Sequence, residues 1–170
     1  MTDFFDMLAA DAKATIASGY YQNVESVERF EASLKAAIQN CKTTPVITEI
    51  KAASPSMGTI RTNINPQKIA LAMQSGGAVG LSVLTEPKHF NGSLATLMQA
   101  RLAVKLPILM KDIVLDPIQV DAAKKVGANG VLLIFALYSR GYGKMSLEEM
   151  IAYVHEAGLE VLLETHTLEE

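Results

Sequence analysis

The chain has 170 residues, of which 49% are hydrophobic and 19% are charged, and its formal net charge is −3. This is the composition of an ordinary globular protein with enough apolar material for one core, and its slightly acidic balance argues against a nucleic-acid-binding protein. The single cysteine, Cys41, excludes an intramolecular disulfide and a cysteine metal cluster, and no apolar run reaches the ~20 residues of a membrane helix.

The N-terminal segment is predicted to be helical. Apolar residues recur at helical spacing from Phe4 to Ala12, and Gly19 can end that helix. A second apolar stripe between Val27 and Ile38 predicts a second helix, so residues 1–44 are expected to form a helical extension. The first residues carry acids where a secretory signal needs bases, and they show no cleavage pattern. We therefore expect a cytoplasmic protein.

From residue 45 onward, short apolar runs alternate with amphipathic stretches. The apolar runs predict strands at 46–50, 80–84, 107–110, 130–135 and 160–163. The stretches between them begin with a capping residue or a proline, as helices do: NPQKIALAMQSGGA, GSLATLMQARLAV, DPIQVDAAKKVGA and SLEEMIAYVHEAG. Strands that are apolar throughout and are joined by helices belong to a parallel sheet.

Two parallel architectures compete, the open doubly wound sheet and the (β/α)8 barrel. A dinucleotide-binding sheet would carry G-x-G-x-x-G directly after its first strand, where this chain has Lys-Ala-Ala-Ser-Pro-Ser at 51–56. Polar residues follow the ends of several different strands, at Lys51, Thr85-Glu86, Lys111 and Glu164. A barrel collects its functional residues in this way. We therefore predict an α/β fold of the (β/α)8 barrel type.

The length predicts an incomplete barrel. Residues 45–170 hold five strand units of about 24–33 residues each, and three more would give the usual barrel size of about 250 residues. The last four residues, Thr167–Glu170, have the pattern of a capping box that opens the fifth barrel helix. Five strands leave two open sheet edges. We therefore expect this chain alone to be inactive and to aggregate or form oligomers.

Five segments, in order and at matching spacing, resemble the indole-3-glycerol phosphate synthase family: EIKAASPS, LSVLTEPKHFNGS, PILMKDIVLDPIQV, GANGVLLIFAL and GLEVLLETHTLEE. The resemblance runs from about Glu31 to the last residue. It implies a (β/α)8 barrel preceded by helices, and a lyase of tryptophan biosynthesis that uses no cofactor. The implied reaction is the decarboxylating, dehydrating ring closure of 1-(2-carboxyphenylamino)-1-deoxyribulose 5-phosphate to indole-3-glycerol phosphate.

Four charged residues match the catalytic positions of that family. Ring closure needs an acid that protonates a ketone, and the dehydration that follows needs a proton donor and a base. The resemblance implies that Lys111 is the general acid, Glu164 the general base and Lys51 a second catalytic lysine. Glu49 lies two residues before Lys51 on a strand, so it shares its face and would hold both lysines. A structural ion pair is the alternative, and the division of proton transfers between Lys51 and Lys111 stays open.

The predicted substrate-binding residues lie in the loops and on the strands around these charges. Ser54, Pro55 and Ser56 begin the first loop, where serine hydroxyls can donate to a phosphate or carboxylate oxygen, unless the segment is an ordinary turn. The resemblance implies that Phe90 packs on the aromatic part of the substrate, and a plain surface aromatic residue is the alternative. Leu132 is predicted to line the pocket, unless it belongs to the core. Ile113 stands where the family usually has phenylalanine, which removes aromatic packing of roughly 0.5–1.5 kcal/mol.

Other functions remain open. The histidines show no metal-ligand spacing, so no metal site is predicted: His89, His155 and His166. The alternatives to the synthase are another phosphate-binding barrel enzyme, either a phosphoribosylanthranilate isomerase or a Schiff-base aldolase that uses Lys111, and an inactive barrel fragment. The expected partner is a phosphorylated small molecule, with no nucleic acid and no membrane, and the oligomeric state is open.

Overall fold

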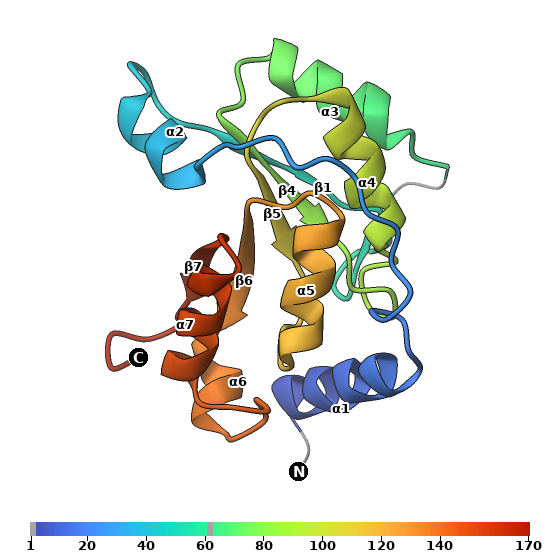
Figure 1. The fold of residues 1–170 in the computed structure, drawn as a ribbon. Helices are drawn as coiled ribbons and strands as arrows, with labels where there is room; N and C mark the ends of the chain where they lie inside the picture. Colours follow the sequence, from blue (N-terminus) through green and yellow to red (C-terminus); the bar gives the residue numbers. More distant parts are fainter. Residues whose placement is uncertain (1–2, 61–62) are drawn as a thin grey trace.

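A computed structural model describes residues 3–60 and 63–170 of the chain, and its centre is a parallel sheet of five strands (Figure 1). The strands are β1 (Ile47–Ile50), β4 (Gly80–Leu84), β5 (Ile108–Lys111), β6 (Gly130–Ile134) and β7 (Glu160–Glu164). They lie side by side in this order, and each neighbouring pair is parallel. All five carboxyl ends therefore reach the same edge of the sheet.

Four helices connect these strands, as the sequence predicts. They are α3 (Pro66–Ser75), α4 (Leu94–Ala103), α5 (Pro117–Lys125) and α7 (Leu147–Glu156). Each N-cap side chain accepts a hydrogen bond from a backbone N–H of the first turn: Asn65, Ser93, Asp116 and Ser146. This capping satisfies donors that a helix otherwise leaves free, which is why the helix starts could be predicted from local sequence.

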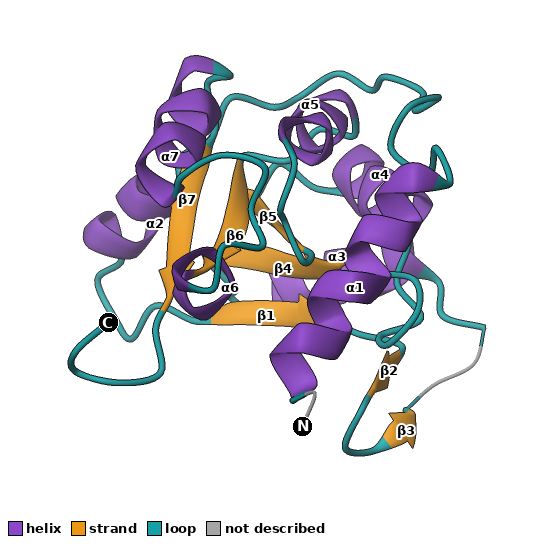
Figure 2. Cartoon of the chain, turned by 90° about the horizontal axis from the view of Figure 1, so that it is seen from below, coloured by secondary structure: helices purple, strands orange, loops and turns teal. Residues whose placement is uncertain are grey.

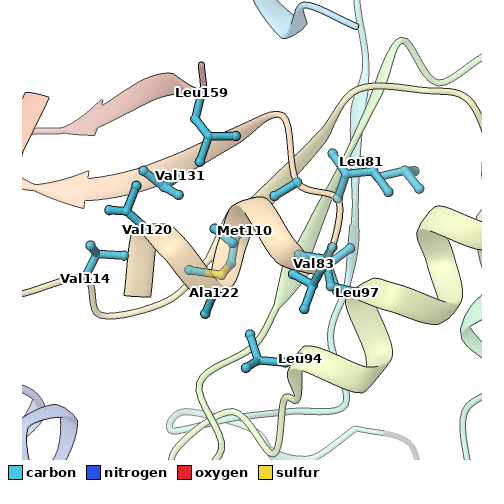
Figure 3. Packing of buried hydrophobic residues seen from close by; sticks show 14 of the residues in the cluster. Leu81, Val83, Leu94, Leu97, Met110, Val114, Val120, Ala122, Val131 and Leu159 are labelled. Atoms are coloured by element: carbon cyan, nitrogen blue, oxygen red, sulfur yellow. The ribbon is translucent and has the colours of Figure 1, made fainter. Parts of the chain in front are cut away.

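All four connecting helices contribute buried side chains to the main core on one face of the sheet. Alternate strand residues such as Leu81, Val83, Met110 and Val131 are buried there against side chains of the helices (Figure 3). Leu132 on β6 points to the other face, because successive strand residues alternate. Helices on a single face exclude the doubly wound sheet and match part of a (β/α)8 barrel. The predicted fold class is confirmed.

Two short features were not predicted. The loop after β1 forms a small antiparallel hairpin of β2 (Ala53–Ser54) and β3 (Gly58–Thr59), which Figure 2 shows outside the main sheet. A short helix, α6 (Phe135–Ser139), follows β6 directly. Neither has the apolar periodicity of a longer element, because each is only a few residues long.

The first helix, α1 (Phe4–Ala17), forms as predicted and lies at the end of the sheet to which the strands point (Figure 1). Asp3 and Asp6 form a capping box at its start, and Gly19 follows its end with a φ of 81°, a conformation that glycine adopts without strain. Its buried residues are Leu8, Ala9 and Ala12.

The prediction of a second helix between Val27 and Ile38 is only partly right, because α2 spans Leu34–Asn40. The preceding residues form no helix, and hydrogen bonds with the barrel satisfy part of their backbone. Val27 N donates to the carbonyl of Lys125 (2.9 Å), and Asn129 Nδ2 donates to the carbonyl of Phe30 (2.8 Å). The apolar side chains of this stretch therefore recur at helical spacing without forming one helix.

The start of α2 is held by a carboxylate from β7. Glu160 Oε2 accepts hydrogen bonds from the backbone N–H groups of Leu34 (2.7 Å) and Lys35 (3.2 Å). Glu160 Oε1 accepts from the hydroxyl of Ser33, which is the N-cap of the helix. A negative charge at this position satisfies free N–H groups and interacts favourably with the helix dipole.

The capping box predicted at Thr167–Glu170 is not formed, and residues 165–170 contain no helix. The carboxylate of Glu170 instead accepts a hydrogen bond from the backbone N–H of His166 (2.7 Å). β1 and β7 are the outer strands of the described sheet, and Leu162 and Leu163 on β7 are 43% and 40% exposed.

Candidate active site

Glu49 on β1 holds two lysines at the carboxyl end of the sheet. Its Oε1 lies 3.0 Å from Lys51 Nζ, and its Oε2 lies 3.0 Å from Lys111 Nζ at the end of β5. The hydroxyl of Ser82, on the strand between them, donates to the same Oε2 at 3.4 Å. Glu49 and Lys51 thus meet on one face of β1, in keeping with their spacing of two residues.

The two ammonium groups keep Glu49 ionised. Burial alone would raise the pKa of Glu49, but the hydrogen bonds from Lys111 and Lys51 outweigh burial and hold this pKa below its ordinary value. The side chains of Lys111 and Lys51 are 35% and 36% exposed, so solvent reaches both ammonium groups. The cluster therefore presents hydrogen-bond donors on two cations to a molecule that approaches from solvent.

A cavity of about 270 Å³ opens at the same end of the sheet. It is lined by five of the predicted site residues, which come from four different strand ends or the loops after them: Phe90, Lys111, Ile113, Leu132 and Glu164. Lys111 belongs both to this cavity and to the ion-pair cluster. Glu49 and Lys51 line a separate depression beside β1, so Lys111 joins the two halves of the candidate site.

Glu164 reaches the cavity from the last strand. Its Oε1 lies 3.3 Å from Nε2 of His166, which also lines the cavity. The ring of His166 packs edge-on against Phe5 of α1, with centroids 5.3 Å apart. The strand ends at Glu164 and the chain bends, so both side chains face the cavity although strand alternation no longer applies.

The structure does not bring Ser54, Pro55 and Ser56 into this cavity. The hydroxyl of Ser54 is buried and accepts a hydrogen bond from the backbone N–H of Met57 (3.2 Å), and it lies 3.4 Å from the hydroxyl of Ser56. Pro55 and Ser56 are exposed. In this conformation Ser54 stabilises the turn of the β2–β3 hairpin.

Sequence reasoning missed the part of the cavity wall that α1 provides. Phe4, Phe5 and Leu8 line the cavity, and Leu8 packs in one apolar cluster with Ile113 and Leu132. The helix is attached by its aspartates to distant loops. Asp11 pairs with Lys88 and with Nε2 of His89 (2.7 Å), and Asp6 accepts a hydrogen bond from the hydroxyl of Tyr142 (2.7 Å). These contacts join segments that the sequence pattern does not connect.

Asp112, directly after Lys111, is a buried carboxyl group in the cavity wall. It accepts hydrogen bonds from the hydroxyls of Tyr21 (3.0 Å) and Thr85 and from the backbone N–H of Ile113 (2.8 Å). Burial outweighs these hydrogen bonds and raises the pKa of Asp112 to about 6. The sequence offered one signal, a carboxyl group at a strand end beside the predicted acid Lys111.

The described residues contain no group of three or more His, Cys, Asp or Glu side chains arranged to hold a metal ion. The helices in this part of the chain are all too short, or too polar, to cross a membrane.

Comparison with known proteins gives one consistent result. The family model described as "Indole-3-glycerol phosphate synthase" matches residues 7–170. A protein of that name from Methanocaldococcus jannaschii is 47% identical over 141 residues, covering 81% of this chain and 51% of the relative. Those from Carboxydothermus hydrogenoformans and Neisseria gonorrhoeae are 46% identical over 125 residues and 50% identical over 121 residues, covering 74% and 71% of this chain.

The chain spans about half the length of these curated relatives, which is 46% for the second and 45% for the third. The family match, in contrast, extends over nearly all of the chain and includes both α1 and the five-stranded sheet. With the lysine–glutamate cluster at the strand ends, this match identifies the chain as a member of the indole-3-glycerol phosphate synthase family.

Proposed function

We propose that this chain carries the first half of the active site of an indole-3-glycerol phosphate synthase. The enzyme would close the pyrrole ring of 1-(2-carboxyphenylamino)-1-deoxyribulose 5-phosphate with loss of carbon dioxide and water. The observation that carries the proposal is the bridge from Glu49 to Lys51 and Lys111, in which Lys111 also faces a cavity that Glu164 lines. A pair of cations beside an apolar cavity suits a substrate with an aromatic ring and two anionic groups.

Lys111 would act as the general acid of ring closure. The ring carbon that bears the carboxyl group attacks the ketone carbon, and the Lys111 ammonium donates a proton to the ketone oxygen. Carbon dioxide then leaves and restores the benzene ring. In the dehydration that follows, a lysine protonates the departing hydroxyl and Glu164 accepts a proton from the new ring. Both side chains line one cavity, which is what these successive steps require.

Lys51 would hold the carboxylate or phosphate of the substrate and would donate a proton in one of the two steps. Glu49 holds both ammonium groups in place through its two ion pairs, so it is a positioning residue in this scheme. The apolar wall formed by Phe90, Ile113 and Leu132 would receive the aromatic ring. We also propose that the loop of Ser54, Pro55 and Ser56, which begins three residues after Lys51, contacts an anionic group of the substrate.

The same proposal covers organisation and location. Residues 1–44 would form a helical extension whose first helix covers the mouth of the barrel, and residues 45–170 would form the first five βα units. The place of action would be the cytoplasm, where a small phosphorylated substrate is available. Neither nucleic acid nor a membrane is needed for this chemistry.

The proposal is tested on the natural protein that contains these residues. Its intact mass is measured first, and formation of indole-3-glycerol phosphate is then followed by fluorescence. Turnover that Lys111→Ala abolishes supports the proposal, whereas a natural protein without turnover contradicts it. Borohydride treatment with a ketone substrate provides the control for a Schiff-base aldolase, since only that mechanism adds the substrate mass covalently to Lys111. The chain of 170 residues, prepared alone, is expected to give no turnover.

A further inference from the structure

We propose that Glu86 is a positioning residue for the aromatic part of the substrate, and that it acts through Phe90. This inference rests on the proposed function, because it assigns Phe90 to the substrate ring. Glu86 follows β4 and is 2% exposed, although it is an acid in the wall of the cavity. A buried carboxylate is unfavourable unless hydrogen bonds or charges compensate for its lost hydration.

The compensation comes from the backbone of one short loop. Glu86 Oε1 accepts a hydrogen bond from the N–H of Lys88 (2.9 Å), and Oε2 accepts from the N–H groups of His89 (2.6 Å) and Phe90 (3.1 Å). The backbone carbonyl of Glu86 accepts a fourth bond from the N–H of Gly92 (2.9 Å). One carboxylate thus organises the backbone of residues 86–92.

These contacts leave Glu86 poorly suited to moving protons. Both carboxylate oxygens are already used by N–H donors of the protein, and hydrogen bonds to an ionised acceptor are the stronger ones. In the described part of the chain no cation forms an ion pair with Glu86. Its carboxylate therefore interacts with the backbone N–H groups of the loop instead. The geometry points to a structural anchor that lies close to the reaction without taking part in it.

The anchor determines where the Phe90 ring lies. Phe90 is attached on both sides, because its N–H donates to Glu86 and its carbonyl accepts from the N–H of Ala53 (3.2 Å), which follows Lys51 by two residues. Gly92 fixes the far end of the loop, since an added Cβ there would lie 2.5 Å from the carbonyl oxygen of Leu84. These contacts attach the loop to β4 and to the segment after β1, and they hold Phe90 in the wall of the cavity.

The test uses Glu86→Gln in the natural protein, because the amide keeps the size of the side chain but offers one acceptor oxygen in place of two. Its NH₂ group then meets an N–H donor of the loop. We expect the KM for the substrate, and the Kd for anthranilate as a probe of the aromatic part, to rise about tenfold while kcat changes less than threefold. The backbone amides of Lys88, His89 and Phe90 are expected to exchange with solvent at least tenfold faster. Glu25→Gln, which removes an exposed carboxylate, is the control and should leave KM, Kd, kcat and the amide exchange rates unchanged.

A double-mutant cycle shows whether the effect passes through Phe90. If Glu86 acts by placing that ring, Glu86→Gln should raise KM no further in a Phe90→Ala background. Additive effects would overturn the proposal, and so would a lower kcat with a shifted pH profile, which indicates proton transfer. Unchanged amide exchange in Glu86→Gln would also overturn it, and this measurement needs no turnover. Absence of product from the unmodified protein would instead count against the proposed function.

Discussion

Replacing Asp112 by asparagine should change how the stability of the fold depends on pH. Asp112 is fully buried, and burial raises its pKa from 3.8 to about 6. The folded protein therefore binds this proton more tightly than the unfolded chain does. The stabilisation is fully present below pH 3.8 and is lost as the pH rises to about 6. A pKa difference of this size corresponds to about 3 kcal/mol in the free energy of unfolding.

Asparagine at position 112 cannot bind or release a proton, so the free energy of unfolding of this variant lacks the pH-dependent contribution of Asp112. We expect the free energy of unfolding of Asp112→Asn, minus that of the unmodified protein, to increase by about 3 kcal/mol between pH 3.5 and pH 7. Urea unfolding at half-unit pH intervals measures this difference, in which all other titrating groups cancel. The sign of the difference at one pH is not decisive, because asparagine also alters the hydrogen bonds with Tyr21 and Thr85.

The matched control is Asp121→Asn. Asp121 also accepts a hydrogen bond from a tyrosine hydroxyl, that of Tyr153 (2.9 Å). Unlike Asp112, however, Asp121 is exposed, so its carboxylate keeps its contact with water. A constant difference for Asp112→Asn across the whole pH range would refute the reasoning. It would mean that hydrogen bonds from Tyr21, Thr85 and the Ile113 backbone fully offset the cost of burying the charge.

Three further predictions concern the site and its supports. Glu49→Gln removes the charge that holds Lys51 and Lys111, so kcat/KM of the natural protein should fall about tenfold or more, and an unchanged value would mean that the lysines need no counter-ion. Glu160→Gln weakens the cap of α2 and should lower the free energy of unfolding by about 1–2 kcal/mol in urea, an effect not expected for the exposed Glu156→Gln. The third prediction is that α1 separates from the barrel in acid. Hydrogen bonds from Arg140 to Asp3, from Tyr142 to Asp6 and from Lys88 to Asp11 lower the pKa of each aspartate. The contact of α1 with the barrel is therefore stabilised above pH 3.8, and this stabilisation is lost as the pH falls below that value. Amide exchange in α1 should therefore accelerate in acid before exchange in the sheet does.

The strands and connecting helices could be predicted because their signals are local. The N-caps Asn65, Ser93, Asp116 and Ser146 lie directly before the helices that they begin, and each apolar run spans only a few residues. The stretch after Val27 could not be predicted, because its backbone is satisfied by residues such as Asn129 that lie about a hundred positions away.

The same limit applies to the site. The spacing of Glu49 and Lys51 on one strand is local, and their contact with Lys111 follows once the strands are known to be parallel. The contribution of α1 to the cavity depends instead on anchors far along the chain, such as the bond from the Tyr142 hydroxyl to Asp6, a separation of 136 residues. Nothing in the pattern around Phe5 indicates that its ring would meet His166.

The attachment of α1 also has a consequence for synthesis of the chain on the ribosome. This helix is made before its partners, which include Lys88, Ile113 and Arg140, and the last of these is 137 residues beyond Asp3. At translation rates of about 5–20 residues per second, the helix waits on the order of ten seconds before its docking surface exists. During that interval its apolar side is open to solvent and to chaperones. Proteolysis of stalled nascent chains should find α1 cleavable until Arg140 has left the ribosome and protected afterwards.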